Sequence, residues 1–267
     1  MMKKGVNAWI YPSDFKPERV LEASAQIGFE GVELNLDENI LKMPKAERKA
    51  IAQKAASLNL KLPSLCSGLF WKYNLASPDA KTRAKGTEII KESCEFAADV
   101  GAKVLLVVPA VATAEVTYQQ MWEWSRQSIE KAVPAAATYD VTLGIENVWN
   151  RFLYSPLDFV RFVKEFDSPN VRAYFDVGNM HFLGFSEQWV RYLEGMLACV
   201  HVKDFHRPTI QFKPLFEGDV PWKEVVKALR ETKYDGFLNV ELSPYPSHPL
   251  KAAMDSKTAL DIILSMK

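Results

Sequence analysis

The sequence of 267 residues has no excess of charge of either sign. Its 33 lysines and arginines balance 33 aspartates and glutamates, so the formal net charge at pH 7 is zero. A chain that binds nucleic acid or an anionic membrane through its overall charge carries a basic excess. The composition therefore argues against nucleic acid and membrane as partners.

Cysteine is scarce, and long hydrophobic runs are missing. The three cysteines, Cys66, Cys94 and Cys199, have neither CxxC nor zinc-finger spacing, so we expect reduced thiols that pack as small apolar side chains. The basic N-terminus lacks the apolar region and cleavage site of a signal peptide. No run is long enough to span a bilayer. These absences predict a cytoplasmic protein.

What the sequence does contain is a regular alternation of strand-like and helix-like segments. Eight such pairs, with no linker or composition break, predict one (β/α)8 barrel domain over residues 1–267, with a doubly wound sheet as the alternative. Right-handed crossovers then bring all strand C-termini to one face. The predicted strands are 5–10, 31–36, 60–66, 104–108, 141–146, 171–176, 196–202 and 236–241. The predicted helices are 17–28, 44–58, 77–100, 117–139 (broken near Pro134), 155–166, 187–194, 220–232 and 250–266, with an aromatic loop at 67–75 and a lid candidate at 208–219.

Polar side chains occur at the ends of four consecutive predicted strands, the fifth to the eighth. They are Glu146, Asp176, His201 and Glu241. Three crowded carboxylates raise one another's pKa, and a divalent cation removes that repulsion. Oxygen ligands with one imidazole suit Mn²⁺, Mg²⁺, Co²⁺ or Zn²⁺, with Mn²⁺ favoured. The alternative is four unrelated polar residues that cap helices or pair with lysines.

Several segments resemble the sugar phosphate isomerase/epimerase superfamily of xylose-isomerase-like barrels. The resemblance covers most of the chain, is strongest in its second half, and lies near the ketose 3-epimerases. The segments that carry it are ENVWN (146–150), FDVGN (175–179), HVKDF (201–205), EGDVPW (217–222) and YDG (234–236), followed by Glu241.

This resemblance implies a metal-dependent epimerase or isomerase of a ketose or ketose phosphate. It implies that Glu146, Asp176, His201 and Glu241 hold the cation and that the two glutamates also do acid–base work. One glutamate would remove the C3 proton, and the other would return a proton to the opposite face of a metal-stabilised cis-enediolate. Which glutamate is the base stays open.

Two further residues are expected to bind substrate. Arg207 follows His201 by six residues, the position of a substrate-binding arginine in the ketose 3-epimerases. Asn179 follows Asp176 by three residues, where those enzymes usually carry a histidine. Asparagine can hydrogen-bond a sugar oxygen but cannot act as an acid or base at neutral pH. Because of this departure, sugar phosphates and related polyols remain candidate substrates beside free ketoses.

Other residues near the strand ends have two interpretations each. Glu33 is either a residue of the barrel mouth or a buried partner of a lysine. Lys203 either pairs with a ligand carboxylate or contacts substrate. Four aromatic side chains either line a sugar site or pack the top of the barrel: Trp9, Phe70, Trp71 and Trp149.

Other functions compete with the epimerase. A keto-inositol dehydratase would use the same proton abstraction and then expel a hydroxyl group. A DNA-repair endonuclease of the superfamily normally needs several extra histidines, and only four histidines occur here. A barrel that only binds a sugar would not need four metal-type residues. A homo-oligomer is compatible with such barrels, although no stretch of the sequence demonstrates one.

Overall fold

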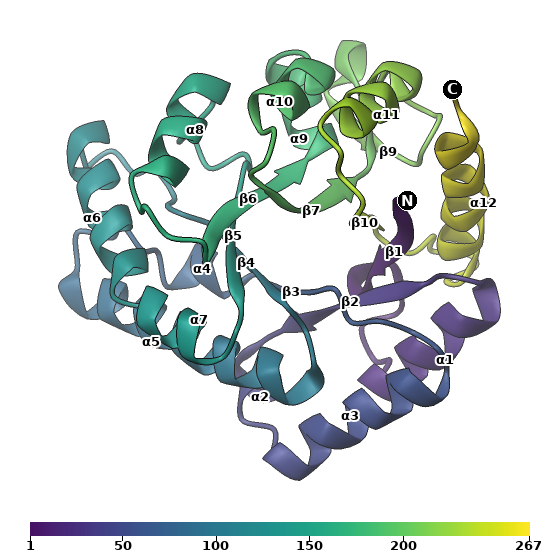
Figure 1. Cartoon of the computed structure of the whole chain (residues 1–267), viewed down its shortest axis with the longest axis horizontal. Coiled ribbons are helices and arrows are strands. Elements are labelled where there is room, and N and C mark those ends of the chain that lie inside the picture. Colours follow the sequence, from purple (N-terminus) through teal and green to yellow (C-terminus); the bar gives the residue numbers. More distant parts are fainter.

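Eight parallel strands close into a barrel, and helices form a layer around it (Figure 1). The computed structural model describes residues 1–267. The strand order is β1-β10-β7-β6-β5-β4-β3-β2, and β10 pairs with β1 to close the sheet. The predicted (β/α)8 barrel is confirmed, and the doubly wound sheet is excluded because such a sheet stays open. The strands are β1 (Lys3–Asn7), β2 (Gly31–Leu36), β3 (Ser64–Ser67), β4 (Val104–Val107), β5 (Thr142–Glu146), β6 (Val171–Asp176), β7 (Leu197–Val202) and β10 (Phe237–Val240).

Several helices begin or end at residues that suit a helix terminus. Asp79 accepts hydrogen bonds from the second and third amides of α5, and Gly101 ends that helix with a left-handed φ of 81°. Pro17 opens α1 and Gly28 ends it in the same way. The α-helices are α1 (Pro17–Ile27), α2 (Glu38–Leu41), α3 (Lys45–Ser57), α4 (Leu69–Lys72), α5 (Ala80–Val100), α6 (Tyr118–Glu130), α7 (Val133–Thr138), α8 (Pro156–Lys164), α9 (Val177–Leu183), α10 (Ser186–Tyr192), α11 (Trp222–Glu231) and α12 (Lys251–Ser265).

Two predicted strands differ from those observed by more than one residue at an end, for local reasons. The first ends at Asn7, whose side chain accepts a hydrogen bond from the amide of Trp9 and starts a 3₁₀ turn, η1 (Ala8–Ile10). The third begins only at Ser64, because Pro63 has no amide hydrogen to donate to the sheet. The helix predicted over 117–139 is divided as expected, into α6 and α7.

Several connections contain structure that the sequence did not predict, including the short helix α2 and, within the predicted aromatic loop, α4. Helix α9 follows β6 directly although it contains Gly178, a poor helix former. A Cβ atom at this glycine would lie 2.8 Å from the backbone oxygen of Lys203, so close packing excludes a larger residue. The predicted lid, 208–219, contains β9 (Gln211–Lys213), which pairs with β8 (Asp204–His206) just before it, and the 3₁₀ turn η2 (Arg207–Thr209) joins these two strands.

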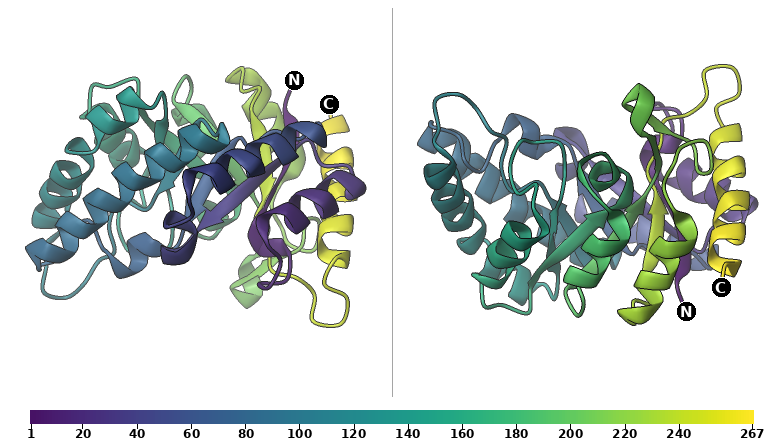
Figure 2. Two further views of the ribbon diagram at one scale, coloured as in Figure 1. Left: turned by 90° about the horizontal axis from the view of Figure 1, so that it is seen from below. Right: turned by 90° about the horizontal axis from the view of Figure 1, so that it is seen from above.

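One hydrophobic cluster joins the barrel to the surrounding helices. The two chain ends lie close together at one side of the molecule (Figure 2), because β1 and α12 are neighbours in the closed ring. None of the helices combines the length and the apolar character needed to cross a membrane.

Candidate active site

Four polar residues converge where β5, β6, β7 and β10 end. Glu146 and Asp176 are the last residues of β5 and β6, His201 precedes the last residue of β7, and Glu241 directly follows β10. The Nδ1 atom of His201 lies 3.6 Å from Glu146 Oε1, 3.8 Å from Asp176 Oδ2 and 3.8 Å from Glu241 Oε2. We call these four residues the donor set.

An irregularity in the pairing of β6 with β7 brings two members of the donor set side by side. The register runs from Ala173 opposite Leu197 to Tyr174 opposite Cys199, so one residue of β7 is skipped. Asp176 therefore lies opposite His201. Without the bulge, Asp176 would lie opposite a residue that points to the other face of the sheet.

The donor set fits a divalent cation. His201 Nδ1 is buried and lacks a hydrogen-bond partner, and Asp176 Oδ2 is buried beside the Lys203 ammonium. Ligand atoms of Glu146, Asp176 and His201 all lie within 4.8 Å of one another. Atoms bound to one cation at about 2.0–2.3 Å are roughly 3–4.5 Å apart, which matches these separations. Glu146, Asp176 and His201 can therefore hold a metal ion, and Glu241 places a further carboxylate beside them.

Lys203 forms ion pairs with two carboxylates of the donor set. Its Nζ lies 2.8 Å from Asp176 Oδ2 and donates a hydrogen bond to Glu241 Oε2. The ammonium group also lies 4.7 Å from the centre of the Phe212 ring. The interpretation of Lys203 as a partner of ligand carboxylates is confirmed.

This asymmetric pairing moves the pKa values of the two glutamates apart. Burial raises the pKa of the Glu146 carboxyl to about 7; the contact with His201 lowers this pKa, and the charges of Glu241 and Asp176 raise it. Burial also opposes ionisation of Glu241, but the charges of Lys203 and His201 lower its pKa to about 2. Lys203 has no ion pair with Glu146 within 4 Å, which accounts for the difference.

Glu33 contacts the donor set from the other side of the barrel, and the sequence interpretations of this residue were wrong. It is fully buried rather than at the mouth, and its charged partner is His201 rather than a lysine, with Nε2 2.5 Å from Glu33 Oε1. Burial opposes ionisation, but the charge of His201 lowers the pKa of Glu33. A carboxylate between Val32 and Leu34 in an apolar strand was the available signal.

Two asparagines hold Asp176 in place. The side chain of Asn147 donates to the backbone oxygen of Asp176 and accepts from its backbone amide, both at 2.9 Å. The backbone amide of Asn179 donates to Asp176 Oδ1 at 2.7 Å, and its side chain donates to the Asn147 oxygen at 3.0 Å. Asn147 was not singled out from the sequence, although it directly follows Glu146.

Arg207 lies apart from the donor set. Its guanidinium donates to the backbone oxygens of His181, at 2.8 Å, and of Gly184. It also lies 5.6 Å from the centre of the Phe185 ring. Asn179 lines the cavity at the barrel mouth, whereas Arg207 does not.

A cavity of about 270 Å³ opens at the barrel mouth, next to the donor set. Glu146, Glu241 and Lys203 line it together with Trp9, Trp71, Trp149 and Phe212. Phe70, in contrast, is fully buried in the hydrophobic cluster. The volume lies near the lower end of the range for small-molecule sites, and aromatic walls with a few polar groups are typical of them.

Asp204 holds the hairpin that contributes Phe212 to this cavity. Its carboxylate accepts hydrogen bonds from the amides of Phe216 at 2.9 Å and Val220 at 3.1 Å, and from Trp222 Nε1 at 2.8 Å. Asp204 therefore has a structural role, which is to hold the hairpin above the mouth cavity.

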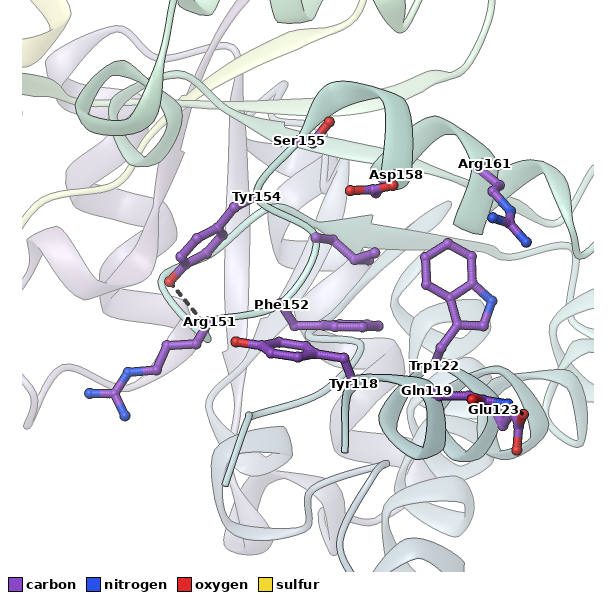
Figure 3. A pocket seen from close by; sticks show the side chains of 11 residues that line it. Tyr118, Gln119, Trp122, Glu123, Arg151, Phe152, Tyr154, Ser155, Asp158 and Arg161 are labelled. Carbon is purple, nitrogen blue, oxygen red and sulfur yellow. Dashed lines mark hydrogen bonds between the residues drawn. The ribbon is translucent and has the colours of Figure 1, made fainter. Parts of the chain in front are cut away.

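A larger cavity of about 850 Å³ lies between α6 and α8 (Figure 3). None of the donor set lines it. Figure 3 shows the Arg151 side chain directed away from Trp122, and the Arg151 amide donates to the Tyr154 hydroxyl at 2.8 Å. Because its walls hold no cluster of potential metal ligands, we place the candidate site at the barrel mouth.

Buried acidic side chains and an imidazole at strand C-termini, below a small aromatic cavity, lie at the face where (β/α)8 barrel enzymes carry their active sites. The model of one family, described as xylose isomerase-like TIM barrel, matches residues 21–262. The chain belongs to the xylose isomerase-like TIM barrel family, and the resemblance noted in the sequence is confirmed.

Relatives and structural neighbours in this family are sugar epimerases. The L-ribulose-5-phosphate 3-epimerase UlaE of Salmonella paratyphi A is 26% identical over 232 residues, which are 83% of this chain and 80% of that protein. The structure of D-psicose 3-epimerase with D-tagatose from Clostridium cellulolyticum H10 matches with a TM-score of 0.86 and 19% identity over 99% of both chains. The 3-keto-D-glucoside 4-epimerase YcjR from E. coli matches with a TM-score of 0.81 and 18% identity, over 98% of this chain and 99% of that one. At these identities, the two structures show the shared fold.

Proposed function

We propose that this protein is a divalent-metal-dependent 3-epimerase of a ketose or ketose phosphate. The observation that carries the proposal is the convergence of Glu146 and Glu241 on His201 Nδ1 at the floor of the mouth cavity. The curated relative UlaE, an L-ribulose-5-phosphate 3-epimerase, supports the same activity.

The two glutamates are arranged for proton transfer on opposite sides of a bound sugar. Glu146 comes from β5 and Glu241 from β10, with β6 and β7 between them in the ring. One carboxylate removes the C3 proton, and the other returns a proton to the opposite face, which inverts the carbon. A bound cation supplies Lewis-acid stabilisation of the negative charge that develops on the sugar oxygens. Trp9, Trp71 and Trp149 narrow the access of water to the reacting carbon.

The finer assignments belong to the same proposal. Mn²⁺ is the ion we favour, because three carboxylates and one imidazole form a mostly hard ligand set. Asn179 is well placed to contact substrate because it lines the mouth cavity. Arg207 has to leave the oxygens of His181 and Gly184 before it can reach a sugar. We also propose one domain over residues 1–267, a cytoplasmic location and assembly into a homo-oligomer.

Deuterium exchange tests the function directly. Protein loaded with Mn²⁺ is incubated in D₂O with ketoses, ketose phosphates and keto-inositols, the cation is removed, and the compounds are analysed by NMR. We expect deuterium at C3 together with the inverted sugar for at least one ketose. Glu146→Gln and Glu241→Gln should each slow exchange by about 10²–10⁴-fold, the usual contribution of an acid–base group.

The control is Glu88→Gln, which changes an exposed glutamate of α5 that pairs only with Lys91. It should exchange at the wild-type rate. Loss of water from a keto-inositol would select the dehydratase instead. A protein that binds the cation but labels no compound, or glutamine variants that exchange normally, would refute the proposed mechanism.

A further inference from the structure

Glu33 reaches His201 across the inside of the barrel. The two residues lie on β2 and β7, which are separated in the closed sheet by β1 and β10 (Figure 1). Both side chains are fully buried. Glu33 Oε1 lies 2.5 Å from His201 Nε2, so the contact joins opposite parts of the barrel wall beneath the donor set.

Three side chains direct hydrogens at the Glu33 carboxylate, and His201 Nε2 is the fourth polar neighbour. Asn7 Nδ2 donates to Oε1 at 2.7 Å, beside His201 Nε2. Ser64 Oγ donates to Oε2 at 2.6 Å, and the Tyr174 hydroxyl donates to the same oxygen. Hydrogen bonds from Asn7, Ser64 and Tyr174 to the two oxygens stabilise the ionised form of Glu33, and a carboxylate can only accept from His201 Nε2.

The neighbouring contacts fix the direction of the two hydroxyl bonds. Asn239 Nδ2 donates to Tyr174 Oη at 3.0 Å and to Ser64 Oγ at 3.1 Å. An amide nitrogen can only donate, and its two hydrogens are shared among these hydroxyls and Cys199 Sγ at 3.2 Å, so the hydroxyls direct their own hydrogens to Glu33. His201 Nε2 therefore faces an ionised carboxylate and carries a hydrogen that it donates to Glu33 Oε1.

That assignment determines what the other ring nitrogen does. An imidazole that binds a cation has to be neutral, and with its hydrogen on Nε2 its lone pair lies on Nδ1. Nδ1 is the atom that lies 3.6–3.8 Å from oxygens of Glu146, Asp176 and Glu241, and it has no hydrogen-bond partner. From this geometry we infer that Glu33 is a positioning residue that fixes the tautomer of His201 so that Nδ1 is a ligand of the divalent cation.

A purely structural role for Glu33 makes a different prediction. Burying a carboxylate is costly, and an apolar side chain of similar size usually serves packing as well or better. Removal of a structural ion pair would change the free energy of unfolding without a specific effect on the cation. Carboxylate partners that orient a metal-bound histidine change metal affinity instead, typically by about 10–100-fold.

The first test measures cation affinity. Mn²⁺ is titrated calorimetrically into the wild type, Glu33→Gln and Ser64→Ala. Whichever way the new amide of Glu33→Gln turns, the charge-assisted bond to Nε2 is lost, so affinity should fall by about 10–100-fold. Ser64→Ala is the matched control, because it removes a buried donor to Oε2 and leaves the bond between Oε1 and His201 intact. It should lose stability but change affinity by less than about threefold.

The second test does not depend on a variant that folds. NMR of ¹⁵N-histidine-labelled wild type with Mg²⁺ should show a slowly exchanging hydrogen on His201 Nε2 and none on Nδ1. A hydrogen on Nδ1, wild-type affinity in Glu33→Gln, or equal losses in both variants would overturn the inference. So would the absence of any cation binding by the wild type.

The inference rests on the proposed function only through the bound cation, and the two can fail separately. A wild type that binds Mn²⁺ with the expected histidine signals but labels no ketose in D₂O would refute the function and leave the role of Glu33 standing. An active epimerase whose Glu33→Gln variant keeps its cation affinity would refute only the role of Glu33.

Discussion

Three residues within one short segment, His201, Lys203 and Asp204, have different partners. His201 faces the donor set, Lys203 neutralises Asp176 and Glu241, and Asp204 accepts hydrogen bonds from the loop after β9. The first two side chains point into the barrel because residues two apart on a strand share a face. Sequence spacing alone predicts that shared direction but not the partners.

Cys94 in α5 illustrates how burial without a partner acts on one titratable group. The thiol is fully buried, and burial raises its pKa to about 12. In the unfolded chain a cysteine ionises near pH 8.5. Above that pH the unfolded state binds fewer protons than the folded state, so this contribution to stability is present below pH 8.5 and is lost as the pH rises towards 12.

We therefore predict that Cys94→Ala changes the pH dependence of stability. Between pH 9 and 10 the free energy of unfolding of the variant should fall less steeply than that of the wild type, by up to about 1.4 kcal/mol per pH unit. The measurement is urea unfolding under reducing conditions at several pH values, with the difference at pH 7 as the baseline. If the free energy of unfolding falls equally steeply with pH in the variant and the wild type, the prediction is wrong.

At the scale of elements, the hairpin of β8 and β9 depends on one carboxylate. Asp204 accepts from Phe216, Val220 and Trp222, so the loop is tied to α11 and to the barrel wall. A Cβ atom at Gly218 would lie 2.5 Å from the Phe205 backbone oxygen, which shows how tightly the loop packs. This packing gives a short connection a defined shape above the mouth cavity.

Asp204→Asn should loosen the hairpin and the loop that follows it. The amide nitrogen cannot accept, so at least one donor is left without a partner, at about 1–3 kcal/mol for each. We expect faster chymotryptic cleavage after Phe212 and Phe216, both of which are exposed, and faster amide exchange in residues 205–222. Asp219→Asn is the control, because Asp219 is partly exposed and its bonds to the Arg207 amide are long, at 3.3 Å. Equal cleavage of the two variants would show that Asp204 does not hold the loop.

For the whole molecule, the donor set joins elements that are far apart in the sequence. Its members come from β5, β6, β7 and β10, half of the strands of the barrel. A cation held by all four binds the folded barrel and not the unfolded chain, because only folding brings the ligands together. Ligand binding to the folded state alone stabilises it by mass action.

Removing the cation should therefore lower the melting temperature. A free cation concentration 100 times the dissociation constant adds about 2.7 kcal/mol, or about 5–10 °C for a chain of this size. Differential scanning fluorimetry with Mn²⁺ and with EDTA measures the shift. Asp176→Asn removes one ligand charge at nearly constant volume, so this variant should lose most of the difference in melting temperature between Mn²⁺ and EDTA. The same melting temperature in Mn²⁺ and EDTA would argue against a cation at the donor set.

The sequence by itself determined what depends on neighbours along the chain. Helix boundaries at Asp79, Gly101 and Gly28 follow from capping, and the β-strands follow from short apolar runs. Closure into a barrel follows from eight such alternations. Because strand C-termini of a barrel share one face, the sequence also brought Glu146 and Glu241 to the same region.

Only the tertiary structure decided which side chains meet across the barrel. The partnership of Glu33 with His201 depends on how β2 lies opposite β7, and the alignment of Asp176 with His201 depends on a bulge that no local residue pattern signals. The position of Arg207 is set by backbone oxygens of α9 and its end. These contacts depend on register and close packing between distant segments, and sequence periodicity carries no information about either.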